Sequence, residues 1–245
     1  STLFPYTTLF RSVKLGTIAA YVAESGKAGA LLELSCETDF VGTNPKFTAF
    51  AHDLARVVCE SDPSDVEALK GCAMGKATVA DALTEMIHVI GENMKIVRFQ
   101  RVSVENGALS SYVHLGGKLA DIVMFSFSNA ATAERDEFKT FAHDVAMQVA
   151  ASAPVAARRE DVPAQTIERE KAIYLAQATD SGRPEAIWET IANGKLEKFY
   201  KQIVLTEQVF IKDSSLTIFE LAKRTSDACD DTIGIEGFVR FSFGE

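Results

Sequence analysis

Cysteine and histidine are scarce in this sequence, and no apolar run is long. The four cysteines form no CxxC pair and have no histidine at zinc-like spacing; they are Cys36, Cys59, Cys72 and Cys229. No apolar stretch reaches the roughly 18 to 20 residues that a membrane-spanning helix needs, and no charged-then-apolar signal segment opens the chain. We therefore expect buried, reduced thiols, no metal or cofactor, no membrane contact and a cytoplasmic location.

Basic residues are outnumbered by acidic ones. The 245 residues carry 25 Lys and Arg against 34 Asp and Glu, a net charge of −9, and they contain no run of Lys or Arg. Proteins that bind nucleic acid through its phosphates, or that dock on anionic membranes, need the opposite balance. With 47% hydrophobic residues, the chain can bury one large core or two small ones. We expect a globular protein that binds another protein or a small molecule, with no direct contact to nucleic acid.

Familiar catalytic motifs are missing as well. The sequence contains no GxSxG, P-loop, GxGxxG or HExxH motif. Its two His-Asp pairs, His52-Asp53 and His143-Asp144, are reminiscent of metal-dependent phosphohydrolases, but such a site needs further His and Asp ligands and the chain has only four histidines. A phosphohydrolase is one alternative; histidines that pack on helices are the simpler interpretation.

An internal repeat relates two parts of the chain at an offset of 91 residues. Many positions between Tyr21 and Pro63 recur unchanged between Tyr112 and Pro154; in the first copy they include Tyr21, Val22, Gly26, Lys27, Phe47, Phe50, Ala51, His52, Asp53, Ala55, Val58, Ser61 and Pro63. Two copies of a unit of about 45 residues predict two similar subdomains, since a solenoid needs three or more repeats.

Each copy reads as strand, turn, strand and helix. Apolar runs predict strands over 17–22 and 28–36, and over 108–114 and 121–128, joined by Gly-Lys turns. Helices that start near Phe47 and Phe138 have apolar residues on one face, so each must cover a sheet. The predicted fold is α+β: two similar subdomains of antiparallel sheet covered by helices, spanning 13–106 and 107–245.

Further elements follow from the remaining pattern. Helices are predicted over 65–70, 79–90 and 216–224, and strands over 94–104 and 237–243. Two helices joined by the turn 180–184 form a helical hairpin over about 163–201, inserted in the second subdomain. Residues 1–12 have neither alternation nor helical period, and we expect them to be a non-native leader.

The stretch Ser35 to Val41 is the main candidate for function. It follows a buried strand and precedes turn residues, so Thr38 to Val41 are predicted at a strand end or loop, where Phe40 has no obvious core to enter. Phe40 could still fill the local core while Asp39 caps a turn. The alternative is an exposed acidic and aromatic wedge that docks on a partner. Because Glu37 to Val41 correspond to the different residues Ser128 to Thr132 in the second copy, they are not part of the shared scaffold, which favours the wedge.

Leu34-Ser-Cys-Glu-Thr-Asp-Phe-Val41 resembles the signature of the elongation factor Ts family, whose members release GDP from elongation factor Tu. The likeness runs from about Gly16 to Gly244. It includes Ile90-Gly-Glu-Asn-Met94, Ser111-Tyr-Val-His114, Ala146-Met-Gln-Val-Ala-Ala-Ser152 and Gly237-Phe-Val-Arg240.

The resemblance implies a guanine-nucleotide exchange factor, a binding protein rather than an enzyme. Its partner would be elongation factor Tu, GDP-bound and nucleotide-free, and its hairpin a coiled coil. The implied partner-binding residues are Thr38, Asp39, Phe40, Val41, Ile90, Gly91 and His114, with Asp39 and Phe40 inserted in the GTPase domain. An adaptor of the same fold without exchange activity is a further alternative, and a homodimer is left open. The family's N-terminal domain of ubiquitin-associated type would lie upstream of Val13, and we expect it to be missing.

Overall fold

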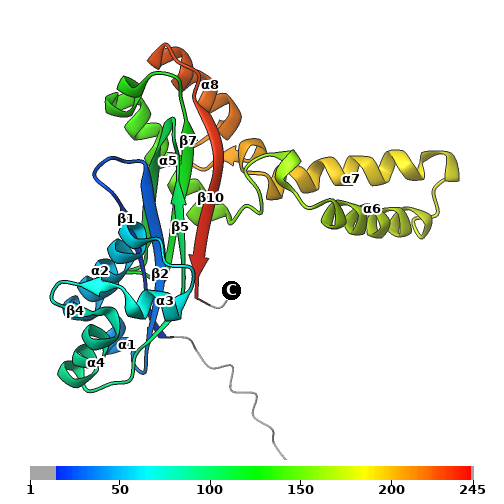
Figure 1. The fold of residues 1–245 in the computed structure, drawn as a ribbon. Helices are drawn as coiled ribbons and strands as arrows, with labels where there is room; N and C mark the ends of the chain where they lie inside the picture. The colour runs from blue at the N-terminus through cyan, green and yellow to red at the C-terminus, as the bar shows by residue number, and fades with distance from the viewer. Residues whose placement is uncertain (1–14, 244–245) are drawn as a thin grey trace, which may run out of the picture.

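Two three-stranded antiparallel sheets form the centre of the fold (Figure 1). The computed structural model describes residues 15–243, so the expected leader at 1–12 lies outside the described residues. The first sheet has the strand order β1-β2-β5 and the second has the order β6-β7-β10. These strands are β1 (Leu15–Val22), β2 (Ala28–Cys36), β5 (Lys95–Ser103), β6 (Gly107–His114), β7 (Leu119–Ser126) and β10 (Gly234–Ser242).

The two sheets pack face to face, because residues along each central strand alternate between its two sides. On β2, Leu31 lies in the apolar cluster between the sheets, while Leu32 and Leu34 lie in the cluster beneath helix α2. On β7, Ile122 lies between the sheets and Phe125 lies beneath helix α5. Strands that are buried on both faces show this division with a period of two. The result is four layers in the order helix, sheet, sheet, helix.

Each sheet has one long helix on its outer face. Helix α2 (Pro45–Ser61) covers the first sheet, and α5 (Asp136–Ser152) covers the second. Both bury the apolar face that the repeat predicts, with Phe47 and its counterpart Phe138 inside the two helical clusters. The helix period seen in the sequence therefore decides which side of each helix meets its sheet.

The structure extends the repeat beyond Pro63 at a second offset. Helices α4 (Val79–Ile90) and α8 (Ile218–Cys229) have the N-cap residues Thr78 and Thr217, 139 residues apart, and each threonine takes part in a capping box. Each helix then leads into the third strand of its sheet. The offset is 91 before this point and 139 here, so the second copy contains an insertion of 48 residues.

The insertion contains the predicted helical hairpin. Helices α6 (Ala164–Thr179) and α7 (Trp188–Ile203) pack on each other and project away from the sheets (Figure 1). At the base of the hairpin, Arg159 forms ion pairs with Glu197 and Glu207. The predicted fold class, α+β with two similar sheet units and a hairpin in the second, is confirmed; the subdomain boundaries stay a prediction.

The remaining elements are short. The short α-helices are α1 (Asp39–Gly42) and α3 (Val66–Gly71), and the short strands are β3 (Ala73–Met74), β4 (Ala77–Thr78), β8 (Val209–Phe210) and β9 (Asp213–Thr217). The 3-10 helices, labelled η, are η1 (Ala130–Glu134), η2 (Arg159–Asp161), η3 (Glu185–Ile187) and η4 (Leu205–Glu207). Strands β3 and β4 pair in the first copy and β8 and β9 in the second, so these small hairpins occupy corresponding places before α4 and α8.

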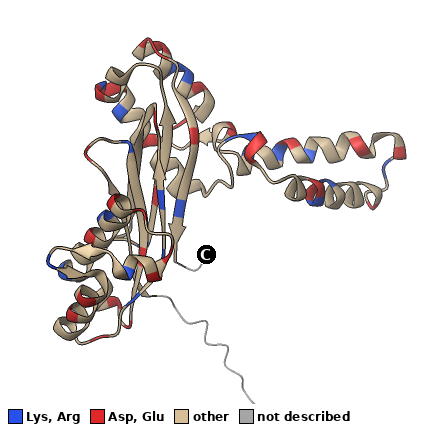
Figure 2. Cartoon of the chain, in the orientation of Figure 1, with Lys and Arg blue, Asp and Glu red and all other residues tan. Residues whose placement is uncertain are grey.

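Charges of both signs are spread over the surface. Figure 2 shows Lys and Arg interspersed with Asp and Glu over the helices and along the projecting hairpin. Within residues 15–243, no helix combines the length and the apolar character that crossing a membrane requires.

Two local predictions need correction. Residues 38–41 do not form a strand end or loop: α1 is a single helical turn, and its N-cap is Thr38 rather than Asp39, since Thr38 Oγ1 accepts a hydrogen bond from the Val41 N–H. Among the described residues all four cysteines are free thiols, but only Cys59 and Cys229 are buried. The other two, Cys36 and Cys72, lie at element ends and are half-buried.

One acidic side chain is buried in the second sheet. Asp121 on β7 is completely buried, and neither carboxylate oxygen has a hydrogen-bond partner among the described residues. Burial raises its pKa to about 8, partly opposed by Arg240, its cross-strand neighbour on β10. The first copy has Ala30 at the corresponding position, so the shared scaffold does not require an acid there.

We expect Asp121 to make stability depend on pH. Because its pKa is higher in the folded chain than the usual 3.8, its contribution is fully present below about pH 4 and is lost as the pH rises to about 8. In Asp121→Asn this loss should disappear. From about pH 4 to about pH 8, the free energy of unfolding of the variant should therefore rise relative to that of the natural chain by more than about 1.4 kcal/mol, the equivalent of one pKa unit.

Urea unfolding at several pH values measures this difference. Asp121→Ala, which reproduces the residue of the first copy, is the second variant and should show the same trend with pH. A difference between variant and natural chain that stays constant from pH 4 to pH 8 would contradict the raised pKa.

Candidate partner-binding site

Phe40 is an exposed aromatic residue on the one-turn helix α1. Its side chain is 89% exposed, the highest value among the large hydrophobic residues in the described part of the chain. An apolar ring of this size gains nothing from facing water, and such anchors supply much of the binding energy of protein interfaces. Of the two interpretations left open by the sequence, the structure excludes the one in which Phe40 fills the core.

The turn that carries Phe40 is held by buried and capped neighbours. Val41, the next residue, is only 8% exposed and belongs to the cluster beneath α2. Thr38 caps the turn from the other side of Phe40. We call Thr38 to Gly42 the wedge turn. Its inner face is fixed to the first sheet while Phe40 points outward.

A carboxylate from a distant part of the chain also binds the wedge turn. Glu92 accepts hydrogen bonds from the Glu37 N–H (3.2 Å), the Thr38 N–H (3.1 Å) and the Thr38 hydroxyl (2.6 Å). Charged acceptors of this kind form the stronger hydrogen bonds in proteins. Glu92 follows the αL residue Gly91, whose φ of +83° ends α4 and suits glycine.

The second copy has the same device without the aromatic residue. Asp231, 139 positions after Glu92, accepts hydrogen bonds from the Ser128 N–H (3.1 Å), the Asn129 N–H (3.0 Å) and the Thr132 hydroxyl (2.6 Å). These bonds lower the pKa of Asp231 to about 2. At the position of Phe40 this copy has Ala131. We call Glu92 and Asp231, with the groups that they bind, the carboxylate clamps of the two copies. The clamp is part of the shared scaffold, and the copies differ in that only the first has a phenylalanine on the clamped segment.

Ile90 and Gly91 adjoin the wedge turn through this clamp. Ile90, the last residue of α4, is half-buried against the core of the first copy, and Gly91 is exposed. Both were predicted from the family resemblance as partner contacts. The structure links them to Thr38 through Glu92, which the sequence reasoning missed although it lies in the quoted Ile90 to Met94 motif.

His114 lies at the end of β6, in the second copy. It is exposed, and its ring stacks on Tyr112 and meets the Tyr112 hydroxyl at 3.3 Å through Nδ1. A shallow hollow of about 400 Å³ lies beside it, and its lining residues are Tyr112, His114, Met147, Ala150, Ala151 and Ile211. We call this lining the His114 patch. Ile211 is 48% exposed there, and the sequence analysis did not single it out.

The two regions are connected by the β6–β7 turn. That turn begins just after His114 and ends at Lys118, whose Nζ lies 2.8 Å from Asp39 Oδ1 in the wedge turn. The predicted site residues thus fall into two groups, the wedge turn with Ile90 and Gly91, and the His114 patch. Tertiary structure joins them although they come from different copies of the repeat.

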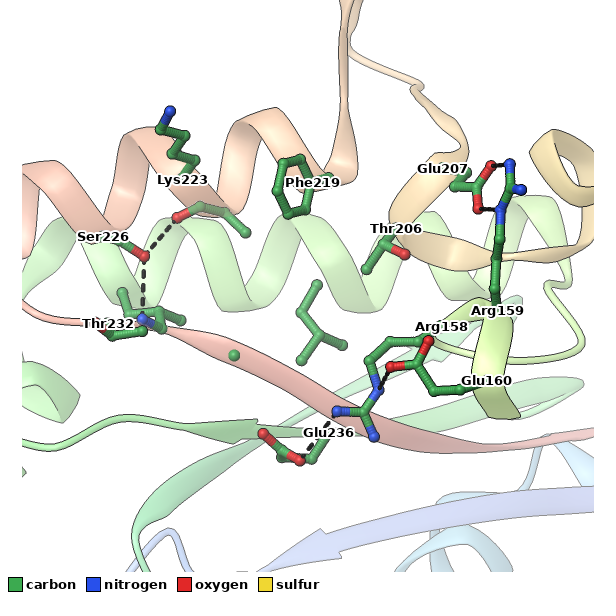
Figure 3. A pocket seen from close by; sticks show the side chains of 14 residues that line it. Arg158, Arg159, Glu160, Thr206, Glu207, Phe219, Lys223, Ser226, Thr232 and Glu236 are labelled. Carbon is green, nitrogen blue, oxygen red and sulfur yellow. Dashed lines mark hydrogen bonds and ion pairs between the residues drawn. The ribbon is translucent and has the colours of Figure 1, made fainter. Parts of the chain in front are cut away.

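A larger hollow, of about 630 Å³, lies elsewhere, between α8, the start of β10 and the base of the hairpin (Figure 3). Phe219 and Lys223 of α8 line one side, and Arg158 lies opposite, near Glu236 (Figure 3). Small-molecule sites need a few polar groups free to orient a ligand. Here both arginines are already paired with carboxylates. Arg158 forms ion pairs with Asp161 and Glu236, and Arg159 forms the pairs with Glu197 and Glu207 described above. We regard the hollow as part of the joint between hairpin and sheet.

The His-Asp pairs do not form a metal-binding group. Within residues 15–243, no three or more His, Cys, Asp or Glu side chains are placed to hold a metal ion. His52 packs edge-on against Tyr21, and His143 packs edge-on against Tyr112. Each histidine therefore packs on the tyrosine at the corresponding position of its own copy.

Comparison with known proteins identifies the family. The family model described as elongation factor Ts matches residues 37–245. Proteins named elongation factor Ts are similar over nearly the whole chain. The one from Clostridium botulinum is 38% identical, covering 94% of this chain and 75% of the relative. The one from Trichlorobacter lovleyi is 39% identical, covering 96% and 76%, and the one from Chloroherpeton thalassium is 38% identical, covering 96% and 81%.

These matches make the chain a translation elongation factor, with a role in protein biosynthesis. It belongs to the elongation factor Ts family.

We expect the carboxylate clamp to stabilise both copies. Glu92→Gln removes the charge that three hydrogen-bond donors share, and should lower the free energy of unfolding by about 1 to 3 kcal/mol. Hydrogen exchange at the Glu37 and Thr38 amides should become faster. Asp231→Asn is the matched variant and should also lower stability, with faster exchange at Ser128 and Asn129. Unchanged exchange at Glu37 and Thr38 in Glu92→Gln would show that the clamp does not hold the wedge turn.

Proposed function

We propose that this chain is a guanine-nucleotide exchange factor for elongation factor Tu. It binds the GDP-bound form, accelerates release of GDP and remains bound to the nucleotide-free form, without covalent chemistry. Membership of the elongation factor Ts family supports the choice of partner. The observation that carries the proposal is Phe40, an aromatic side chain 89% exposed on a turn that is capped, clamped and anchored. We place the activity in the cytoplasm, where translation takes place.

Exchange requires that binding of this chain and binding of GDP weaken each other on elongation factor Tu. Whatever factor the chain contributes to weakening GDP affinity, GDP contributes equally to weakening the affinity for the chain. A side chain that occupies space near the nucleotide in the complex can produce this coupling. A rigid support is needed, because a flexible turn would yield rather than displace the partner. The buried Val41 and the Glu92 clamp provide that support.

Within this proposal the predicted residues have different roles. Asp39 and Phe40 are the inserted contacts, and Thr38 with Val41 holds them. Val41 is buried, so its role is that of an anchor rather than a direct contact. Ile90 and Gly91 contact the GTPase domain beside the inserted pair.

The His114 patch is the second half of the interface. His114 and Ile211 are both exposed beside a shallow apolar hollow, and Tyr112 supports the histidine ring. Contacts at a distance from the wedge turn would hold the complex together while Phe40 acts on the nucleotide site. This division predicts that the patch governs mainly affinity and the wedge turn both affinity and release.

A direct experiment tests the function. Elongation factor Tu loaded with a fluorescent GDP analogue is mixed with the chain and excess unlabelled GDP, and the rate of fluorescence loss is followed. We expect a large increase in the rate of release. Binding without faster release would favour the adaptor alternative of the same fold, and absence of binding would exclude both.

Phe40→Ala should separate function from stability. Because the ring is almost fully exposed, the melting temperature should change little, while binding to elongation factor Tu should weaken by about 2 kcal/mol or more, roughly 30-fold in Kd. Phe219→Ala, which removes another exposed phenylalanine (63% exposed) on α8, is the control and should retain binding and exchange. A marked drop in melting temperature with normal binding in Phe40→Ala would disprove the wedge role.

His114→Ala should weaken the complex more than it weakens the free chain. The corresponding residue in the first copy is Ala23, so the shared fold does not depend on a histidine there. Calorimetric titration gives the affinity and thermal unfolding the stability of each variant. His52→Ala, whose ring also packs on a tyrosine, is the control and should leave affinity unchanged. Equal losses of affinity in both variants would remove His114 from the interface.

A further inference from the structure

The wedge turn is contacted by a lysine from the other copy of the repeat. Lys118 Nζ lies 2.8 Å from Asp39 Oδ1, and 5.6 Å from the centre of the Phe243 ring. The contact joins residues 79 positions apart in the chain. Lys118 is about one-third exposed and Asp39 about two-thirds, so the pair is open to water on one side. The aspartate next to Phe40 is therefore oriented by a group outside its own subdomain.

The backbone that carries Lys118 is fixed on both sides. Gly117 has φ +92°, and a Cβ at this position would collide with the Thr17 hydroxyl of β1, so the turn approaches β1 as only glycine allows. The Gly117 carbonyl accepts a hydrogen bond from the Ile18 N–H (2.7 Å), and the Lys118 carbonyl accepts one from the Phe243 N–H (3.3 Å). Lys118 thus starts from a rigid base.

The same turn begins at His114. The His114 carbonyl accepts hydrogen bonds from the Gly117 N–H (3.1 Å) and the Lys118 N–H (3.2 Å). Helix α1 packs on β1, the strand to which Gly117 is bonded. One tight turn therefore contacts both halves of the proposed interface, the His114 patch at its start and Asp39 at its end.

We infer that Lys118 is a positioning residue for exchange: its ion pair holds Asp39 and the wedge turn in the orientation in which Phe40 enters the partner. The inference rests on the proposed function. Lys118 acts through Asp39, so it supports both affinity and GDP release, and its ion pair also orders the wedge turn in the free chain. It also makes the wedge a product of both copies, because the acid comes from the first and the base from the second.

The repeat supplies a matched control. Lys27 is the counterpart of Lys118 in the Gly-Lys turn of the first copy, and its Nζ bonds only to the Glu105 carbonyl (2.9 Å) in the described structure. Lys27→Gln and Lys118→Gln are the same chemical change in corresponding turns. They differ in that one of them touches the wedge turn.

The test compares natural chain, Lys118→Gln, Lys118→Arg and Lys27→Gln. We measure Kd for elongation factor Tu, the rate of fluorescent GDP release at a saturating concentration of the chain, and hydrogen exchange at residues 40–43 of the free chain.

An ion pair that is partly open to water changes an equilibrium constant by up to about fivefold. In Lys118→Gln we expect affinity and release rate each to fall by up to about fivefold, and hydrogen exchange at 40–43 to become faster. Lys118→Arg, which keeps the charge, should restore most of the rate, and Lys27→Gln should match the natural chain.

Two outcomes would overturn the inference. If Lys118→Gln releases GDP as fast as the natural chain and leaves exchange at 40–43 unchanged, the ion pair positions nothing. If affinity and release rate fall while hydrogen exchange at 40–43 stays as in the natural chain, Lys118 contacts the partner directly and is not a positioning residue. Failure of the natural chain to release GDP would instead remove the proposed function; the hydrogen-exchange comparison would then still decide whether Lys118 orders the wedge turn.

Discussion

The packing of the two sheets against each other is the constraint on which the rest of this structure depends. The cluster between them combines residues of both copies, among them Ile18 and Leu31 from the first and Ile122 and Val239 from the second. One charged pair lies at the same boundary. Arg98 of β5 bonds the fully buried Glu33 (2.7 Å), and it also reaches the second sheet through the Ser242 carbonyl (3.2 Å). Removing either partner of such a pair leaves an uncompensated charge, so the pair favours one arrangement of the sheets. Only in that arrangement does the β6–β7 turn reach the wedge turn.

Duplication explains both the economy of the fold and its asymmetry. Each copy has a two-stranded turn, a covering helix, a capped second helix and a carboxylate that binds the segment after its central strand. The residues that we propose for function are departures from the copy. The first copy has Phe40 where the second has the small Ala131, and the second copy has His114 where the first has Ala23. The hairpin is found in the second copy alone. A duplicated scaffold tolerates such changes where they are exposed, because they remove no core contact.

The proposed interface is composite and preorganised. The wedge turn is bound by Glu92 from beyond α4 and by Lys118 from the second sheet, and Val41 anchors it in the core. In the proposed function, a partner that meets this turn does not have to order it first, which would preserve binding energy for displacement of the nucleotide. The projecting hairpin is attached through Arg159, which pairs with two glutamates and stacks on Tyr200 at 4.3 Å. Its orientation is therefore set by side-chain contacts at its base.

The sequence alone determined the fold class, the order of most elements and the family, because these depend on local signals. The helix α4 and its αL end at Gly91 follow from capping and apolar period, and the two long helices follow from the repeated Phe47 and Phe138 faces. It also pointed to Phe40, since an aromatic residue without a repeat counterpart stands out. What it did not determine were contacts between segments far apart in the chain. The bonds of Glu92 to Thr38 and of Lys118 to Asp39, and the helical form of the wedge turn, depend on how the two sheets meet. Local propensity does not specify how the two sheets pack against each other, so only the tertiary structure determines these contacts.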